Sequence, residues 1–416
     1  MRNGARVQGW FTTLSETERR TFWACFAGWA LDAMDVQIYA VVMPTLIVIW
    51  GLTKGQAGML GTVALLMSAF GGWMAGILAD RIGRARVLQI TILWFSCFTA
   101  LSALATSYEQ LLALRSLQGL GFGGEWAAGA TLMSEVIAPK VRGRAVGSVQ
   151  SGWSIGYGAA ALLFTIVFKL LPPEMAWRAL FAIGALPAIA VFVMRGSLKE
   201  SNLFEAARNR NNADTRVRAI FEPPLLRTTI VASLVATGAL GGNYTILTWL
   251  PTYLSTVRHL SVLNTGGYLG VNIVGSFCGY LFCAHLSDLL GRRATFAISA
   301  VLAAVTILLY TLGNLDGWLV MLLGFPIGFF QSGIVSGMGA CFAELYPTRV
   351  RSSGQGFSYN AGRGIGAVMP ALVGFASASL SLGAAIGLFA VLSYTLVLIG
   401  SALLPETRGR TLAACE

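Results

Sequence analysis

Five ionisable candidates lie inside long apolar runs of this sequence, and two acids and one arginine among them are considered first. Asp32 and Asp35 fall in the first run, and Arg363 falls in the run at 353–378. A charge at the centre of a bilayer costs roughly 2.5–3.5 kcal/mol on insertion scales, so a charge kept there is a candidate for function. Because a guanidinium is permanently charged and can bind a carboxylate through paired hydrogen bonds, Arg363 is the predicted anchor for an acidic ligand.

Helical spacing places the acids on polar stripes. Asp32, Asp35 and Tyr39 are three and four residues apart, which puts them on one face of a helix. A second stripe, at 115–129, contains arginine, glutamine and glutamate in an otherwise apolar run. A buried carboxyl whose charged partner changes is a plausible proton carrier. The predicted proton-coupling residues are Asp32, Asp35, Glu125 and Arg115.

Other polar residues within apolar runs could line a binding cavity around Arg363. The predicted substrate-binding residues are Arg363, Asn360, Tyr359, Asn243, Tyr244, Gln150, Trp153 and Gln331. Aromatic residues also gather at membrane interfaces, and an isolated amide in a span can simply bridge helices.

Structural interpretations of the charged residues remain open. Arg363 could form an ion pair with Asp32 or Asp35 that holds a gate closed. Asp35 could be a hydrogen-bond acceptor in helix packing, and Arg115 could bond to a neighbouring helix.

The amino-acid composition indicates whether the segments that carry these residues lie in water or in lipid. Of the 416 residues, 56% are hydrophobic and 11% are charged, whereas a soluble globule needs roughly 25% charged residues. The net charge of +11 does not indicate nucleic acid, because the basic residues lie between apolar runs. The six cysteines show no metal-ligand spacing. We predict a membrane protein without metal or cofactor.

Apolar runs of about 20 residues, enough to cross a bilayer, predict twelve spans. They lie at 21–44, 57–79, 87–106, 110–137, 145–170, 177–195, 227–256, 264–286, 294–313, 317–345, 353–378 and 382–404. The predicted fold is an all-α membrane protein of twelve transmembrane helices, in two pseudo-symmetric six-helix halves around a central cavity. The predicted halves are 1–195 and 227–416, joined by a cytoplasmic linker at 196–226.

Internal repeats support this division. The segment 76–86 recurs as 285–293, and 135–144 recurs as 344–351, at nearly the same offset along the chain. In such duplicated architectures the substrate binds between the repeats near the bilayer midplane.

Basic residues predict the orientation. Most of the 29 Lys and Arg residues fall in alternate loops and at the termini, and cytoplasmic loops retain positive charge. Both termini are therefore predicted to be cytoplasmic, in a multi-pass protein of the cell inner membrane. Residues 1–20 are polar, so we expect the first span to be retained.

Several motifs resemble those of a known transporter family. The loop at 76–86 resembles the signature between the second and third helices of the major facilitator superfamily, and 115–121 resembles its fourth-helix signature. Residues 31–35 are similar to the Asp-Gly-aromatic-Asp motif of aromatic-acid/proton symporters, with Ala33 and Met34 replacing the middle residues, and to the Asp-x-x-Asp of sialate and monocarboxylate/proton symporters. Residues 123–126 resemble the Gly-Glu-aromatic segment of the sialate and metabolite/proton groups.

The resemblance implies a charge network that latches the cytoplasmic side shut. Its residues would be Asp80, Arg81, Gly83, Arg84, Glu135 and Arg142, with Asp288, Arg292, Glu344 and Arg351 as second-half counterparts.

The predicted function is secondary active import of a small organic acid by proton symport through alternating access. The expected partners are the acid, protons and the lipid bilayer, and the expected state is a monomer. Proton-antiport efflux of drugs or metabolites and facilitated transport of a sugar-like neutral solute remain alternatives. No constellation of an enzyme active site is present outside the spans.

Overall fold

The computed structural model describes residues 10–137, 145, 148–196, 217–223, 225–346 and 350–407. Every regular element in these ranges is a helix, which confirms the all-α prediction. Nine of the described helices are long and apolar enough to cross a membrane. The count of twelve and the layout in two six-helix halves stay predictions.

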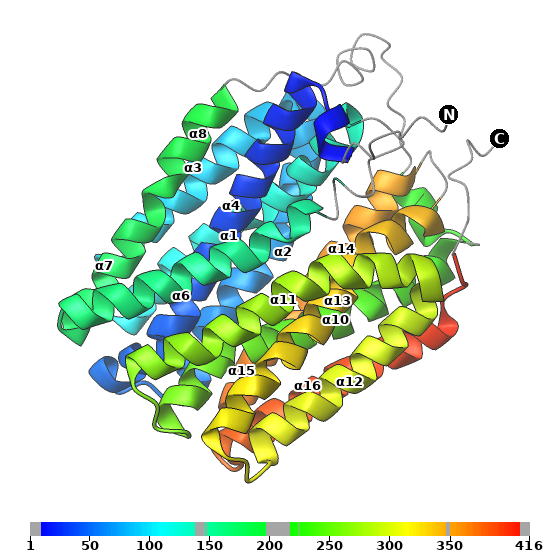
Figure 1. The fold of residues 1–416 in the computed structure, drawn as a ribbon. Helices are drawn as coiled ribbons and strands as arrows, with labels where there is room; N and C mark the ends of the chain where they lie inside the picture. Colours follow the sequence, from blue (N-terminus) through cyan, green and yellow to red (C-terminus); the bar gives the residue numbers. More distant parts are fainter. Residues whose placement is uncertain are drawn as a thin grey trace, which may run out of the picture.

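Two helix groups follow one another along the chain. The first group consists of η1 (Trp10–Thr13), α1 (Glu16–Trp50), α2 (Lys54–Ile82), α3 (Arg84–Ser102), α4 (Tyr108–Val136), α6 (Gly152–Leu170), α7 (Pro173–Ala185) and α8 (Pro187–Gly196). The second group consists of η2 (Val217–Phe221), α10 (Leu225–Thr256), α11 (Val262–Leu290), α12 (Arg292–Leu312), α13 (Gly317–Leu345), α14 (Arg351–Gly366), α15 (Met369–Ala376) and α16 (Leu382–Leu403). The long helices run side by side, and the groups meet where α1 contacts α10, α2 contacts α14 and α15, and α6 contacts α11 (Figure 1).

Local sequence explains where several helices begin and end. Ser15 and Glu18 form a capping box at the start of α1, and Gly51 ends that helix in the left-handed conformation. The turns from α2 to α3 and from α11 to α12 each use one glycine with positive φ, Gly83 at 107° and Gly291 at 95°. A side chain would be strained at either position.

Two of the predicted spans are interrupted. The span at 177–195 is divided into α7 and α8, with Pro187 as the first residue of α8. The span at 353–378 is divided into α14 and α15, with Pro370 in the first turn of α15. Because proline has no N–H to donate, it favours the start of a helix over its interior. Each of these two predicted spans therefore consists of two consecutive helices.

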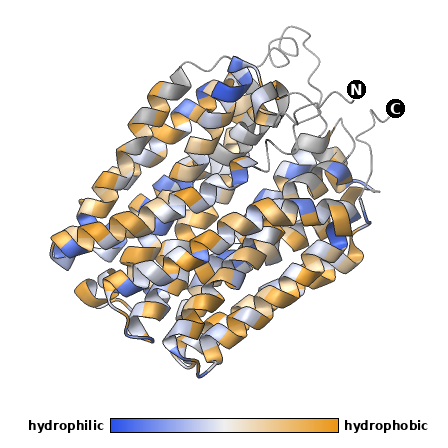
Figure 2. Cartoon of the chain, in the orientation of Figure 1, coloured by the Kyte–Doolittle hydropathy of each residue, from blue (hydrophilic) through white to orange (hydrophobic). Residues whose placement is uncertain are grey.

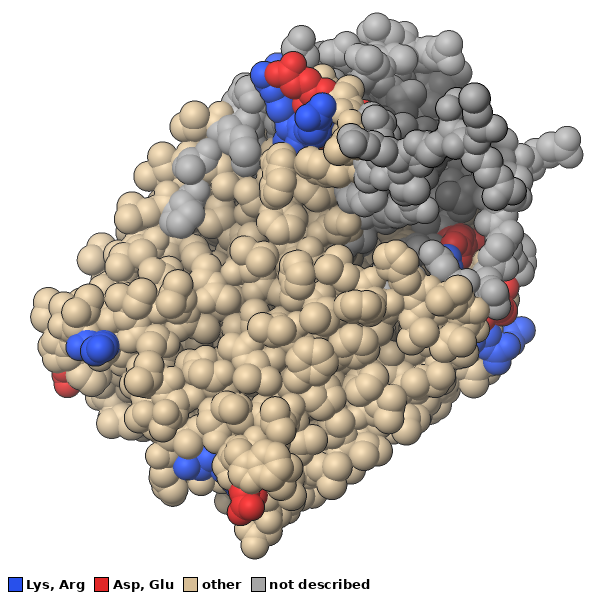
Figure 3. All heavy atoms as spheres, in the orientation of Figure 1, with Lys and Arg blue, Asp and Glu red and all other residues tan. Residues whose placement is uncertain are grey.

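The outer surface of the bundle is suited to lipid. Apolar residues predominate along the helices (Figure 2). On the face shown in Figure 3, the described acidic and basic residues lie toward the ends of the bundle, and the broad band between them carries none. Large apolar side chains such as Val48 and Leu170 are mostly exposed, as expected where hydrocarbon is the solvent.

The two groups are closely packed at the end that contains the turn from α1 to α2. A Cβ added to Gly58 of α2 would collide with the Pro370 carbonyl of α15. The Trp249 indole of α10 donates a hydrogen bond to the same carbonyl oxygen at 3.0 Å. This end of the interface is therefore closed.

Candidate functional site

Arg363 lies at the interface between the two helix groups. It is in α14, and its side chain is almost completely buried, with 1% exposed. Its Cζ lies 4.3 Å from the centroid of the Phe122 ring of α4, in the first group. Tyr244 interacts electrostatically with the guanidinium, and the Arg363 Cζ lies 5.9 Å from the centroid of the Tyr359 ring. Among the described residues, Nε and Nη1 of Arg363 have no hydrogen-bond partner.

Asp32 of α1 supplies a negative charge at this position. It is fully buried and interacts electrostatically with both Arg363 and Tyr359 of α14. The attraction between opposite charges is strong where water is excluded. The structure thus places an acid of the first group near a cation of the second, together with Tyr244 and Tyr359.

Asp35 belongs to a separate cluster within the first group. The Thr99 hydroxyl donates to Asp35 Oδ1 at 2.6 Å, and the Gln118 amide donates to Oδ2. Arg115 Nη1 lies 3.9 Å from Asp35 Oδ2 and donates to Gln118 Oε1 at 2.8 Å. The Arg115 guanidinium also lies 4.8 Å from the Tyr39 ring centroid. This cluster links α1, α3 and α4.

Thr99 was not selected from the sequence. It is one hydroxyl in an apolar run, and a helical threonine commonly bonds to a carbonyl of its own helix, as Thr99 also does to Phe95 O at 2.9 Å. The available signal was that buried Asp35 needed donors on a neighbouring helix.

Of the remaining predicted substrate-binding residues, Asn243, Gln150, Trp153 and Gln331 are buried and Asn360 is partly exposed, and several have unused polar atoms. Within the described part of the chain, Gln331 has no hydrogen-bond partner for either amide atom, and Asn243 has none for Oδ1. Asn360 uses its amide nitrogen on Gly356 O, and its Oδ1 has no partner. Buried polar atoms of this kind are positions for a ligand or an ordered water.

Gln150 and Trp153 are also buried, with 7% and 6% exposed. The structure gives no contact between their described side chains and Arg363. The interactions of Arg363 therefore join it with Asp32, Tyr244 and Tyr359 in one site. That the other candidates belong to the same site stays a prediction.

At one end of the second group, Arg292 and Glu344 form a two-point ion pair. The distances are 2.9 Å from Arg292 Nη2 to Glu344 Oε1 and 3.2 Å from Nε to Oε2. The Thr407 hydroxyl donates to Glu344 Oε2 at 2.6 Å, and Glu406 accepts from the Arg292 backbone N–H at 3.0 Å. Arg292 and Glu344 were both predicted as members of a charge network, and their role in gating stays a prediction. Glu406 and Thr407 were not predicted from the sequence, where the one signal for Glu406 was an acid shortly after the last apolar run.

Several predicted residues cannot be placed in these contacts. Arg142 lies outside the described residues, and so do the side chains of Glu125, Asp80, Arg81, Arg84, Glu135, Asp288 and Arg351. Their roles stay predictions.

Comparison with known proteins matches nearly the whole chain. Residues 25–286 match the Major Facilitator Superfamily, and residues 218–416 match the family described as Sugar (and other) transporter. A protein of Cupriavidus pinatubonensis named "Probable 4-methylmuconolactone transporter" is 43% identical over 96% of this chain and 93% of its own length. The cis,cis-muconate transport protein of Acinetobacter baylyi is 30% identical over 89% of this chain and 90% of its own.

A solved structure shares the fold. The xylose transporter XylE from E. coli, in a partially occluded inward open conformation, has a TM-score of 0.76 with 16% identity, covering 95% of this chain and all of that one. At this identity the similarity concerns the fold and not the cargo.

Proposed function

This chain belongs to the major facilitator superfamily, and we propose that it imports a small organic acid together with protons by alternating access. As a member of this superfamily it is a membrane transporter and not an enzyme. Two relatives that match most of its length are named for transport of 4-methylmuconolactone and cis,cis-muconate. These names favour an organic acid as the cargo.

The observation that carries the proposal is the state of Arg363. A fully charged guanidinium is buried between the helix groups, and two of its nitrogens have no hydrogen-bond partner in the described part of the chain. Burying a cation is costly unless an anion and hydrogen-bond acceptors accompany it. A substrate carboxylate would supply both, which favours an acid over a sugar-like neutral solute.

Asp32 offers a means of proton coupling. Asp32 interacts electrostatically with Arg363. A bound substrate carboxylate would therefore place a second negative charge beside one cation. Protonation of Asp32 removes that excess charge. A carrier that cannot close over unpaired buried charge would then move only when empty or when loaded with both acid and proton.

The Asp35 cluster and Glu125 belong to the same proposal. Asp35 and Arg115 would keep α1 and α4 in register beside the site, and Glu125 would be a further proton carrier on α4. We place the protein in the cell inner membrane as a monomer with both termini cytoplasmic and two six-helix halves, 1–195 and 227–416, that rock about the site.

Transport into proteoliposomes tests this function directly. Labelled benzoate, lactate, sialate and a dicarboxylate would be offered with and without an inward proton gradient. The proposal expects at least one acid to accumulate only with the gradient. Accumulation driven by an outward gradient would indicate antiport, and accumulation of no acid would overturn the proposal.

A further inference from the structure

Two buried indoles face each other across α1 and α6. Trp29 and Trp153 are 5% and 6% exposed, and their ring centroids are 5.2 Å apart with an angle of 50° between the planes. Neither indole Nε1 has a hydrogen-bond partner among the described residues. The two N–H groups are therefore unused donors within a buried part of the first helix group.

Two other described indoles do donate hydrogen bonds. Trp249 donates to Pro370 O at 3.0 Å, and Trp94 donates to Leu117 O at 2.7 Å. Folded proteins leave few buried donors unsatisfied, and exceptions point to a bound molecule or to function. Two exceptions in one contact pair form a small donor site.

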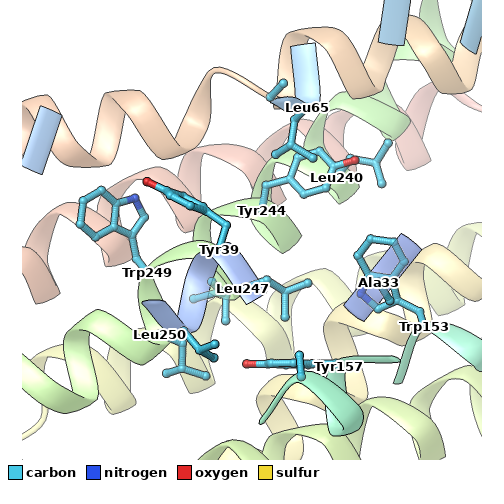
Figure 4. Packing of buried hydrophobic residues seen from close by; sticks show 14 of the residues in the cluster. Ala33, Tyr39, Leu65, Trp153, Tyr157, Leu240, Tyr244, Leu247, Trp249 and Leu250 are labelled. Carbon is cyan, nitrogen blue, oxygen red and sulfur yellow. The ribbon is translucent and has the colours of Figure 1, made fainter. Parts of the chain in front are cut away.

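This pair lies close to the acid-binding site along α1. Trp29 precedes Asp32 by three residues, so both lie on one face about one turn, or roughly 5 Å, apart. Asp32 in turn interacts with Arg363. Figure 4 shows Trp153 beside Ala33 of α1, while the Tyr157 hydroxyl, one turn further along α6, points away from it.

We propose that Trp29 and Trp153 form a second subsite that binds an acceptor oxygen of the substrate. The inference rests on the proposed function, because it takes the substrate carboxylate to be held at Arg363. An indole N–H donates, never accepts and carries no charge. It therefore suits an uncharged carbonyl or ring oxygen, whereas a second carboxylate would be buried without a counter-charge.

The substrate class follows from both subsites. It is a ring-sized monocarboxylate with an uncharged acceptor oxygen at the end opposite the carboxylate.

Two acids that differ only in this oxygen provide the test. Binding of 4-oxocyclohexanecarboxylate and cyclohexanecarboxylate to the purified full-length protein would be measured for the native chain and for Trp29→Phe and Trp153→Phe. We expect the native protein to prefer the oxo acid by about tenfold. Each variant should reduce that preference to about threefold or less by weakening oxo-acid binding alone, because phenylalanine keeps an aromatic face but lacks the donor. Trp94→Phe, which removes an exposed indole outside this pair, should keep the tenfold preference.

Loss of fold and loss of recognition give different results. A variant that only disturbs packing would weaken both acids equally and would overturn the subsite. Equal binding of the two acids by the native protein, or stronger binding of trans-1,4-cyclohexanedicarboxylate, would also overturn it. If panel acids accumulate with a proton gradient while the preference is absent, the subsite alone fails. If no acid accumulates or binds, the proposed function fails with it.

Discussion

Thr62 of α2 accepts a hydrogen bond from the backbone N–H of Ala371 in α15, with 3.1 Å between Oγ1 and N. In an uninterrupted helix this N–H would bond to the carbonyl four residues earlier. Here the helix is interrupted between α14 and α15, so this bond is not formed. A side chain of the first helix group therefore completes the backbone hydrogen bonding of the second. The bond must break whenever the groups separate at this end.

Replacement of Thr62 by valine is expected to loosen the closed end. The substitution keeps the side-chain shape and removes the acceptor, so the Ala371 N–H loses its partner at a cost of about 1 kcal/mol. Hydrogen exchange of the segment 369–376 should become faster. Thr306→Val is the matched control, because the Thr306 hydroxyl bonds to carbonyls of its own helix. Equal exchange in Thr62→Val and the native protein would contradict this role.

Removal of the Arg363 guanidinium is expected to weaken acid binding. A hydrogen bond to a charged group contributes about 1.5–3 kcal/mol, which corresponds to roughly 10- to 150-fold in affinity. Arg363→Gln should show the full loss, and Arg363→Lys should recover part of it by restoring the charge. Equilibrium binding of the transported acid measures both. Unchanged affinity and uptake in Arg363→Gln would remove the role assigned to this residue.

Neutralisation of Asp32 is expected to uncouple acid from proton. In the native protein, acid binding should strengthen as the pH falls, because protonated Asp32 no longer competes with the substrate for Arg363. Asp32→Asn mimics the protonated state, so its acid affinity should be high and nearly independent of pH. Exchange of labelled for unlabelled acid should persist, and gradient-driven accumulation should be lost. Persistent accumulation would assign the proton to another residue.

Asp35 and Arg115 are expected to act as a unit in stability. Loss of either partner leaves a buried charge uncompensated, at a cost of about 3–5 kcal/mol. Asp35→Asn and Arg115→Gln should each lower the unfolding temperature, and the double variant should be more stable than the sum of the two predicts. Interaction energies within such networks are about 0.5–3 kcal/mol. Strictly additive losses in thermal unfolding would show that the 3.9 Å contact contributes nothing.

Helical spacing predicted that Asp32 and Asp35 share one helical face, and it left open which of them is the partner of Arg363. Asp32 and Asp35 were placed on one helical face by spacing, yet Asp32 interacts with Arg363 across the interface and Asp35 with Thr99 inside the first group. Spacing fixes the direction of a side chain only to within a face. The partner depends on how neighbouring helices are packed, which no local pattern records.

Proline illustrates the same limit for helix boundaries. Pro44, Pro251 and Pro326 lie inside the continuous helices α1, α10 and α13, whereas Pro370 stands at the start of α15. Within a membrane, neighbouring helices can satisfy the backbone groups that proline leaves unbonded. Thr62 accepts from the N–H that follows Pro370, and Trp249 donates to the Pro370 carbonyl oxygen. No local pattern in residues 366–371 indicates these distant partners.

Glu406 is expected to fix the start of α12. Its two carboxylate oxygens accept from the backbone N–H groups of Arg292 and Arg293 at 3.0 and 3.2 Å. A carboxylate at this position satisfies free N–H groups and is favoured by the helix dipole. Glu406→Ala should therefore lower the free energy of unfolding by about 1–2 kcal/mol and speed hydrogen exchange in the first turn of α12. The control is Glu174→Ala, which removes an exposed carboxylate from the first turn of α7.

Because Glu406 lies with the Arg292–Glu344 pair and not at Arg363, a change in transport rate at unchanged acid affinity would support a gating role. Weaker acid binding would assign this end of the bundle to the substrate site instead.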